Sequence, residues 1–308
     1  MVLRSRLGLA SHRTRRRRAS GETRLAALLF APTALALAGL VALPLALSLA
    51  VSLTRVDVQS LRLTFVGLRQ WAALLRDPLL ATVLGNTALY WAATLVLGLA
   101  VSLPLAWLLT QEFPGRAAAR VVLLIPFAIA PASLVVVWGW ILNSSYGLLN
   151  GLLYYLGLTA EDTVIAYLTE PWPARASLIF VNLWRIVPFM TLLILAGLQA
   201  VSRDQLDAAR VDGSGPWQTA RHVVLPAIRL QIVAALVVAS VWSIKTFDLV
   251  VGLTNGGPGH STLMIYFYAY RKVFQELDFG YGAVLSYVAF ALMAVAALVS
   301  ARAHADAA

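Results

Sequence analysis

Residues 177–200 read SLIFVNLWRIVPFMTLLILAGLQA, and the polar stretch SRDQLDAARVDGSGPWQTARHVVLP follows at 202–226. As a helix, the first stretch is long enough to cross the apolar core of a bilayer, which takes about 20 residues. Five further apolar runs of comparable length lie on either side of this pair, near residues 25–53, 83–110, 121–142, 230–253 and 281–300. No run alternates as a barrel strand does, so we expect an all-α integral membrane protein with six transmembrane helices.

The composition of the chain supports this class. Of its 308 residues, 60% are hydrophobic and 12% are charged, whereas a soluble domain carries about 25% charged residues. The net charge of +10 suggests contact with anionic membrane lipid and not with nucleic acid, because the chain has little water-exposed surface for a nucleic-acid site. The absence of cysteine excludes disulfides, thiolate metal sites and a cysteine nucleophile.

The positive charges are distributed unevenly among the segments between the apolar runs. Residues 1–24 alone hold eight arginines, and the segments on the same side of the membrane hold fifteen Lys and Arg residues against seven on the other side. Because positive loops stay inside, both termini are expected in the cytoplasm. The chain then divides into a basic cytoplasmic tail at 1–24, a six-helix domain at 25–301 and a C-terminal tail at 302–308.

Several kinds of chemistry have no residues to support them. No phosphate-binding G-x-x-x-x-G-K-[ST] loop occurs, and the only lysines are Lys245 and Lys272. The four histidines are scattered, so no metal site is expected, and no catalytic serine arrangement is recognisable. Among acids only Asp248 falls within a span, which disfavours a proton-coupled secondary transporter without excluding it. We therefore expect no catalytic residue and no cofactor on this chain.

The polar stretch at 202–226 contains the start and stop signals of two short helices. Ser202 with Gln205 forms a capping box for a helix over 203–212, and Gly213 supplies a left-handed stop. Gly215 followed by Pro216 starts a second helix, which we expect to end before Pro226.

The same stretch resembles the loop by which permease subunits of ATP-binding-cassette (ABC) importers engage their ATPases, written E-A-A, three residues, G, nine residues, I, one residue, L-P. This chain keeps every spacing of the motif and has Asp in place of Glu and Val in place of Ile. The matching residues are Asp207, Ala208, Ala209, Gly213, Val223, Leu225 and Pro226. The resemblance implies that 202–226 is a cytoplasmic coupling loop. The residues it implies for contact with the ATPase are Leu206, Asp207, Ala208, Ala209, Val211, Asp212, Gly213, Leu225 and Pro226.

The resemblance covers roughly residues 25–300. Asn182-Leu-Trp184-Arg185 and Leu253-Thr-Asn-Gly-Gly-Pro258 look like segments of maltose-type sugar importers, in particular of the larger permease subunit. This implies a type I ABC importer permease fold in the bacterial inner membrane. It also implies a second permease subunit, an extracytoplasmic binding protein, and two ATPase subunits that carry ATP and Mg. A permease for glycerol phosphate, a polyol or a polyamine, and a stand-alone secondary transporter, remain as alternatives.

The polar residues of the fourth and fifth runs are candidates for a sugar site. Four residues at i, i+3, i+4 and i+7 share one helical face, and two hydroxyls one turn apart follow in the fifth run: Asn182, Arg185, Ile186, Phe189, Ser243 and Thr246. Amides and hydroxyls also hold membrane helices together, so helix packing is the competing interpretation.

Three charges within the spans need partners, because each costs about 2.5–3.5 kcal/mol in hydrocarbon. Lys245 and Asp248 are three residues apart in the fifth run, and Arg185 of the fourth run competes for the same carboxylate. We expect structural charge pairing among them, with substrate contact as the alternative.

Overall fold

Helices of membrane-spanning length dominate the computed structural model, which describes residues 25–305 except 58–59, 61 and 161–162. Within these residues, four helices are long and apolar enough to cross a membrane as continuous rods: Leu25–Ser52, Leu80–Leu108, Pro171–Ala200 and Phe279–Ala296. Two bent helix pairs, Arg116–Ala128 with Pro131–Ile141 and Pro216–Ala227 with Arg229–Ile244, raise the number to six. The described residues thus hold four to six candidate spans by length and composition, and six is the number expected from the sequence. The predicted basic tail at 1–24 and the end of the C-terminal tail, 306–308, lie outside the described residues.

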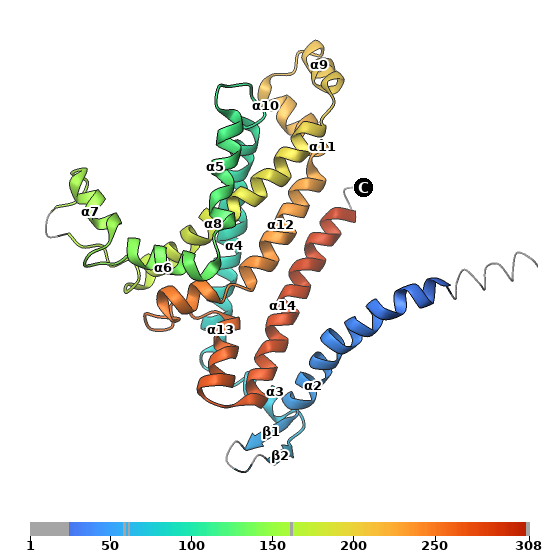
Figure 1. The fold of residues 1–308 in the computed structure, drawn as a ribbon, viewed down its shortest axis with the longest axis vertical. Coiled ribbons are helices and arrows are strands. Elements are labelled where there is room, and N and C mark those ends of the chain that lie inside the picture. Colours follow the sequence, from blue (N-terminus) through green and yellow to red (C-terminus); the bar gives the residue numbers. More distant parts are fainter. Residues whose placement is uncertain (1–24, 58–59, 61, 161–162, 306–308) are drawn as a thin grey trace, which may run out of the picture.

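The helix bundle is built around α4 (Leu80–Leu108) and α8 (Pro171–Ala200), which pack along each other. α12 (Arg229–Ile244) packs against both, and α14 (Phe279–Ala305) packs against α12 (Figure 1). One buried apolar cluster surrounds Phe267 and Leu285, and a second, nearer to α9, surrounds Met190 and Ile194. Small residues permit close approach, since a Cβ on Gly98 of α4 would meet the Sδ of Met190 at 3.0 Å.

The first helix, Leu25–Ser52, stands apart from the bundle over most of its length. It includes a π-helical turn, η1 (Ala38–Ala42), and ends as α2 (Leu43–Ser52), which packs against α14. Leu28 and Phe30 are 72% and 71% exposed. Apolar side chains exposed in this way require a lipid or protein surface to cover them.

The third apolar run, expected as one span near 121–142, is bent into two helices. α5 (Arg116–Ala128) and α6 (Pro131–Ile141) meet at 96°, with Ile129 and Ala130 extended between them. Pro131 explains the break: it lacks an N–H, and its ring disfavours helical backbone at the residue before it.

The fifth run also breaks, so Lys245 and Asp248 do not lie on one continuous helix as expected. α12 ends at Ile244, Thr246 and Phe247 are not helical, and a π-helical segment follows, η3 (Val250–Thr254). The hydroxyl of Thr246 donates to the carbonyl of Trp242 at 3.1 Å, and its N–H donates to the carbonyl of Ser243 at 3.2 Å. The break is stable because these bonds satisfy carbonyls that a continuing helix would have used.

The shorter elements lie mainly at the end of the molecule opposite α9 (Figure 1). They include an antiparallel hairpin of β1 (Thr54–Asp57) and β2 (Arg62–Phe65), in which Thr54 pairs with Phe65, followed by α3 (Arg69–Leu74). They continue with α13 (Ile265–Tyr270) and η4 (Arg271–Gln275), while α7 (Leu148–Tyr155) projects to one side. Asp77 joins this end together, because its carboxylate accepts hydrogen bonds from Tyr268 of α13, at 2.7 Å, and from Tyr281 of α14.

Candidate functional site

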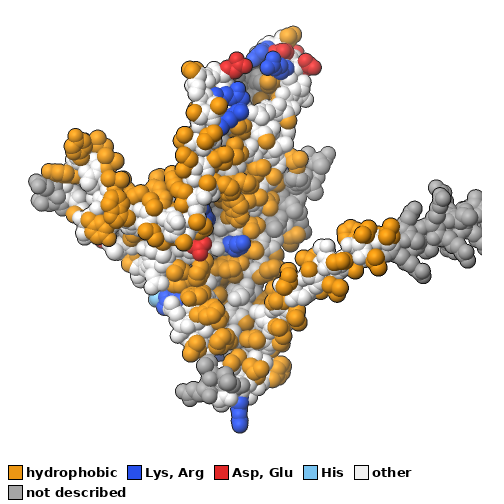
Figure 2. Space-filling model, viewed as in Figure 1, with side chains coloured by type: hydrophobic (Ala, Val, Ile, Leu, Met, Phe, Trp, Pro, Cys, Tyr) orange, Lys and Arg blue, Asp and Glu red, His pale blue; other side chains and the backbone are white. Residues whose placement is uncertain are grey.

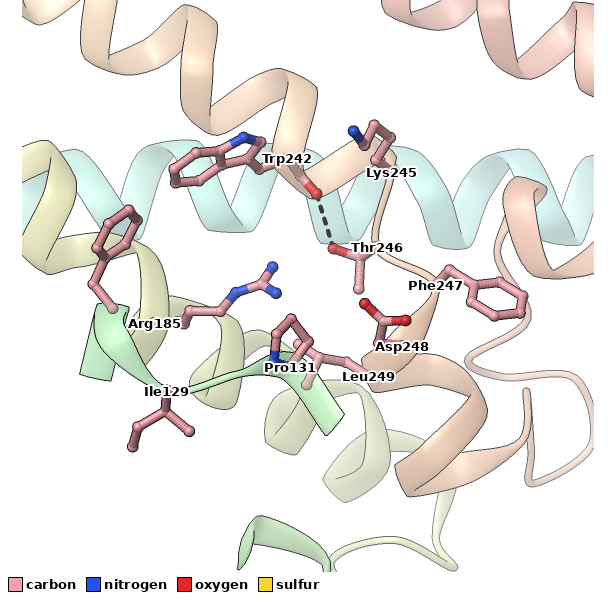
Figure 3. Close-up of a pocket in the computed structure, with 10 residues that line it drawn as sticks. Ile129, Pro131, Arg185, Trp242, Lys245, Thr246, Phe247, Asp248 and Leu249 are labelled. Atoms are coloured by element: carbon pink, nitrogen blue, oxygen red, sulfur yellow. Dashed lines mark hydrogen bonds between the residues drawn. The ribbon is translucent and has the colours of Figure 1, made fainter. Parts of the chain in front are cut away.

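A cavity of about 270 Å³ opens where the breaks in the third and fifth runs meet (Figure 3). Both breaks expose polar backbone and side chains at mid-length of the bundle, and in membrane proteins such backbone occurs where it lines a cavity or is buried in protein. Its walls are formed by Phe127, Ile129, Pro131, Arg185, Trp242, Lys245, Thr246, Phe247, Asp248 and Leu249.

The charged side chains of the cavity do not form the ion pairs that we expected. Arg185 extends into the cavity from α8 toward Thr246 and Asp248, whereas Lys245 points away from Asp248 (Figure 3). Among the described residues, no ion pair joins any two of these three side chains. The break at 245–247 is the reason, since it removes the helical i, i+3 geometry on which the Lys245–Asp248 pair depended. The charges face an open cavity instead.

Asn182 lies behind the cavity wall, fully buried between three helices. Its amide nitrogen donates to Thr94 Oγ1 of α4 at 3.2 Å and to Ser243 Oγ of α12 at 3.5 Å. Its amide oxygen accepts from Nη2 of Arg185 at 3.0 Å. Asn182 therefore joins the helices and also fixes the guanidinium that enters the cavity.

The six residues predicted for a sugar site fall into two groups. Arg185 and Thr246 line the cavity, and the ring of Phe189 packs beside it, with ring centroids 5.6 Å from Phe127 and 5.0 Å from Trp242. Ile186 and Ser243 are buried among the helices, as Asn182 is. For these three the packing interpretation describes the structure better.

Sequence reasoning missed three aromatic residues of the cavity, Phe127, Trp242 and Phe247. Trp242 precedes Thr246 by four residues, so the helical period could have placed both on one face. No comparable local signal existed for Phe127, because it reaches the cavity only through the break that follows α5.

The polar loop forms a compact unit of short helices at one end of the bundle. α9 (Arg203–Val211) matches the expected helix over 203–212, and Gly213 has a φ of +77°, as its predicted left-handed stop requires. The cap of α9 differs from the expected capping box, because Ser202 Oγ accepts from the N–H of Asp204 at 3.2 Å. A side-chain cap of the expected kind occurs at the next helix, where Oε1 of Gln218 accepts from the N–H of Gly215, three residues before it, at 3.0 Å.

The second helix of the loop is longer than expected. It begins with Pro216 in α10 (Pro216–Thr219), continues as η2 (Ala220–Val224) and ends with α11 (Leu225–Ala227), beyond the predicted stop at Pro226. The π-turn in η2 widens the helix before Pro226, where the ring would otherwise meet the carbonyl of the preceding turn.

The residues predicted for ATPase contact gather on this unit, and most are exposed. Ala209 is buried against the loop, Leu206 and Leu225 are half-buried, and Asp207, Ala208, Asp212, Gly213 and Pro226 are exposed. Val211 is 87% exposed, and Trp217, which the sequence reasoning did not single out, is 73% exposed. Asp207 forms an ion pair with Arg210 at 2.8 Å, with both side chains mostly in solvent. The unit thus presents apolar and acidic groups outward.

The described residues include no group of three or more His, Asp or Glu side chains able to hold a metal ion. Charged and aromatic side chains surround the central cavity instead.

A polytopic helix bundle with a helical loop at one end and a cavity at its helix breaks is the architecture of a membrane permease subunit. The chain belongs to the family of binding-protein-dependent transport system inner membrane components, which it matches over residues 79–306. It is accordingly a permease subunit of a binding-protein-dependent ABC transport system, located in a membrane.

Curated relatives cover most of the chain. It is 33% identical over 273 residues to the sulfoquinovosyl glycerol transport system permease protein SmoG of Agrobacterium fabrum, covering 88% of this chain and 87% of that protein. It is 31% identical over 279 residues to the trehalose transport system permease protein SugA of Mycobacterium tuberculosis, covering 90% and 88%. It is 31% identical over 233 residues to the trehalose/maltose transport system permease protein MalF of Thermococcus litoralis, covering 74% and 76%.

Solved structures confirm the fold. A chain of the bacterial alginate ABC transporter, in complex with an alginate pentasaccharide-bound periplasmic protein, matches with a TM-score of 0.77 at 19% identity. The match covers 92% of this chain and 94% of that one. The expected type I ABC importer permease fold is therefore present.

Proposed function

We propose that this chain forms half of the translocation pathway of an ATP-driven sugar importer in a bacterial inner membrane. A second, different permease subunit supplies the other half, two ATPase subunits bind ATP and Mg at the cytoplasmic side, and an extracytoplasmic binding protein delivers the sugar. The permease names of the relatives, for trehalose, trehalose/maltose and sulfoquinovosyl glycerol, support a sugar as cargo.

The cavity is the single observation that carries this proposal. It places a guanidinium, a carboxylate and a hydroxyl beside the rings of Phe127 and Trp242, and sugars offer both hydroxyls and apolar ring faces to such surfaces. Its volume of about 270 Å³ lies at the small end of ligand pockets, which run about 300–1,000 Å³. This small volume fits a pathway of which this chain supplies one part and a second subunit the other.

The helical loop is proposed as the contact with the ATPase. Val211 and Trp217 are apolar and mostly exposed, and exposed apolar side chains of this kind support contact with a protein partner. The ion pair between Asp207 and Arg210 is solvent-exposed and contributes only about 0.2–1 kcal/mol to folding. The carboxylate is therefore free to exchange Arg210 for a basic group of the partner. ATP-driven closure of the ATPases then moves the helix bundles about the cavity.

Uptake by the reconstituted complex tests the proposal. The chain would be purified with the subunits that accompany it, placed in proteoliposomes, and assayed for ATP-dependent uptake of labelled trehalose and maltose in the presence of its binding protein. Arg185→Ala should abolish most uptake while leaving assembly intact. Uptake of a sugar without ATP or ATPase would instead establish a secondary transporter. ATP-dependent uptake of glycerol phosphate, a polyol or a polyamine, with no sugar transported, would establish the alternative cargo.

A further inference from the structure

A second crevice, of about 620 Å³, lies at the α9 end of the molecule. Trp107 and Thr110 at the end of α4 form one wall, and Arg116, the first residue of α5, borders them. α9 and the following short helices close the other side through Leu206 and Pro216. The crevice thus separates the proposed coupling loop from the ends of two long helices.

Three arginines, Arg116, Arg203 and Arg210, line this crevice, and its walls include no Asp or Glu. Nε of Arg116 is buried and has no hydrogen-bond partner among the described residues. Among the described residues, one of the three forms an ion pair: Arg210 pairs with Asp207 at 2.8 Å, and Asp207 does not line the crevice. Figure 2 shows basic and acidic side chains together at this end of the molecule. Arg203 and the paired Arg210 are exposed. The buried Nε–H of Arg116 lacks an acceptor, which is costly, and an anion in the crevice would supply one.

The remaining wall is apolar and continues toward the membrane. Leu198, Val201 and Val224 line the crevice, and Trp107 is 60% exposed in the last turn of α4. Tryptophan at the end of a spanning helix is typical of the interface between head groups and acyl chains.

We propose that this crevice binds a phosphate group, carried by an anionic phospholipid or by a free phosphate-bearing solute. Guanidinium forks match phosphate oxygens bidentately. Three of them line this crevice, and of these Arg116 and Arg203 form no ion pair among the described residues. A phosphate held by Arg116 and Arg203 joins α5 to α9. It thereby biases the position of the loop relative to the bundle, which makes the site suited to regulating coupling.

The test measures binding of two probes to the purified complex in nanodiscs. In one arm, nanodiscs of phosphatidylcholine with or without 10% phosphatidylglycerol are compared by native mass spectrometry for retained phosphatidylglycerol; in the other, inorganic phosphate is titrated into phosphatidylcholine nanodiscs. Each of Arg116→Gln and Arg203→Gln should weaken binding of the effective probe about fivefold. Arg116→Lys keeps the charge and should weaken it less. Arg221→Gln, an exposed arginine of the same loop outside the crevice, is the matched control.

The two arms separate the two sources. Arginine-dependent retention of phosphatidylglycerol without an effect of phosphate assigns the site to lipid, and arginine-dependent phosphate binding assigns it to a free solute. Binding of neither probe, or equal losses in Arg221→Gln, overturns the proposal. So does a loss of the ATPase subunits in Arg116→Gln and Arg203→Gln with probe binding unchanged, because the arginines would then serve acidic groups of the partner.

Discussion

Arg185 is the one charged side chain of α8 that enters the central cavity, and Asn182 holds it there. Nη2 of Arg185 donates to Oδ1 of Asn182 at 3.0 Å. Asn182 is itself fully buried and donates to residues of α4 and α12. We therefore expect Asn182 to act through Arg185 and not by contacting cargo itself. Deleting either side chain should disturb the same interaction.

This dependence predicts non-additive losses of uptake. Hydrogen bonds to charged groups contribute about 1.5–3 kcal/mol, so Arg185→Ala should lower the uptake rate about 10- to 100-fold. Asn182→Ala should lower it as well, but the double variant should be little worse than Arg185→Ala alone. Asn150→Ala, which removes an amide from α7, is the control and should leave uptake near that of the native chain. Fully additive losses would show that Asn182 acts independently of Arg185.

Asp77 provides a second residue-scale prediction, at the other end of the molecule. Burial raises the pKa of this carboxyl, but hydrogen bonds from Tyr281, Tyr268 and the N–H of Leu79, with the nearby charge of Lys272, outweigh burial and lower the pKa below its ordinary 3.8. A carboxyl whose pKa is depressed by folding contributes stability that is present above 3.8 and is lost as the pH falls through the folded value.

Asp77→Ala should therefore lower the melting temperature at pH 7, because hydrogen bonds to a charged group worth about 1.5–3 kcal/mol are removed. The difference from the native chain should begin to shrink below pH 3.8, where the carboxyl protonates in the unfolded chain, and should disappear once the pH falls below the lower pKa of the folded carboxyl. Thermal unfolding of the detergent-solubilised protein between pH 7 and pH 3 measures this, with the exposed Glu112→Ala as control. A difference that stays constant down to pH 3 would refute the role of the ionised carboxylate.

At the scale of elements, α9 could be predicted almost residue for residue, whereas the cavity could not. Ser202 and Gly213 specify the two ends of α9 through local hydrogen bonding and backbone conformation, which neighbouring residues determine. The cavity depends on the break at Pro131 coming to lie beside the break at Thr246, far along the chain. Pro131 and the polar Thr246 interrupt their apolar runs, and this can be read from the sequence. That the two breaks lie next to each other depends on tertiary packing, which the local sequence does not determine.

Gly213 gives the prediction at this scale. A Cβ built there meets no atom within 4 Å, so only the φ of +77° disfavours other residues. Left-handed backbone costs a non-glycine residue roughly 1–2 kcal/mol, and more for a β-branched one, whereas Asn tolerates it. Gly213→Val should reduce co-purification of the ATPase and uptake about tenfold, and Gly213→Asn should retain both. If Gly213→Val assembles and transports like the native chain, the turn is not needed for docking.

At the scale of the whole molecule, the charged loop and the hairpin lie at opposite ends of the bundle (Figure 1). The helices between them are apolar, and the cavity lies between these ends. An alternating pathway needs this layout, because the part that meets ATPases must be separated from the part that meets an extracytoplasmic partner by the thickness of the membrane. The excess of Lys and Arg on the α9 side predicts that this side is cytoplasmic.

Cysteine labelling in intact cells tests this orientation without background, because the native chain has no cysteine. Ser60→Cys lies in the exposed turn between β1 and β2, and Ser214→Cys lies in the loop between α9 and α10. A membrane-impermeant maleimide added outside should label Ser60→Cys at once and should label Ser214→Cys only after permeabilisation. Labelling of both after permeabilisation controls for access. The reverse pattern in intact cells would place the loop outside and would separate it from any cytosolic ATPase, so it would overturn the coupling proposal together with the topology.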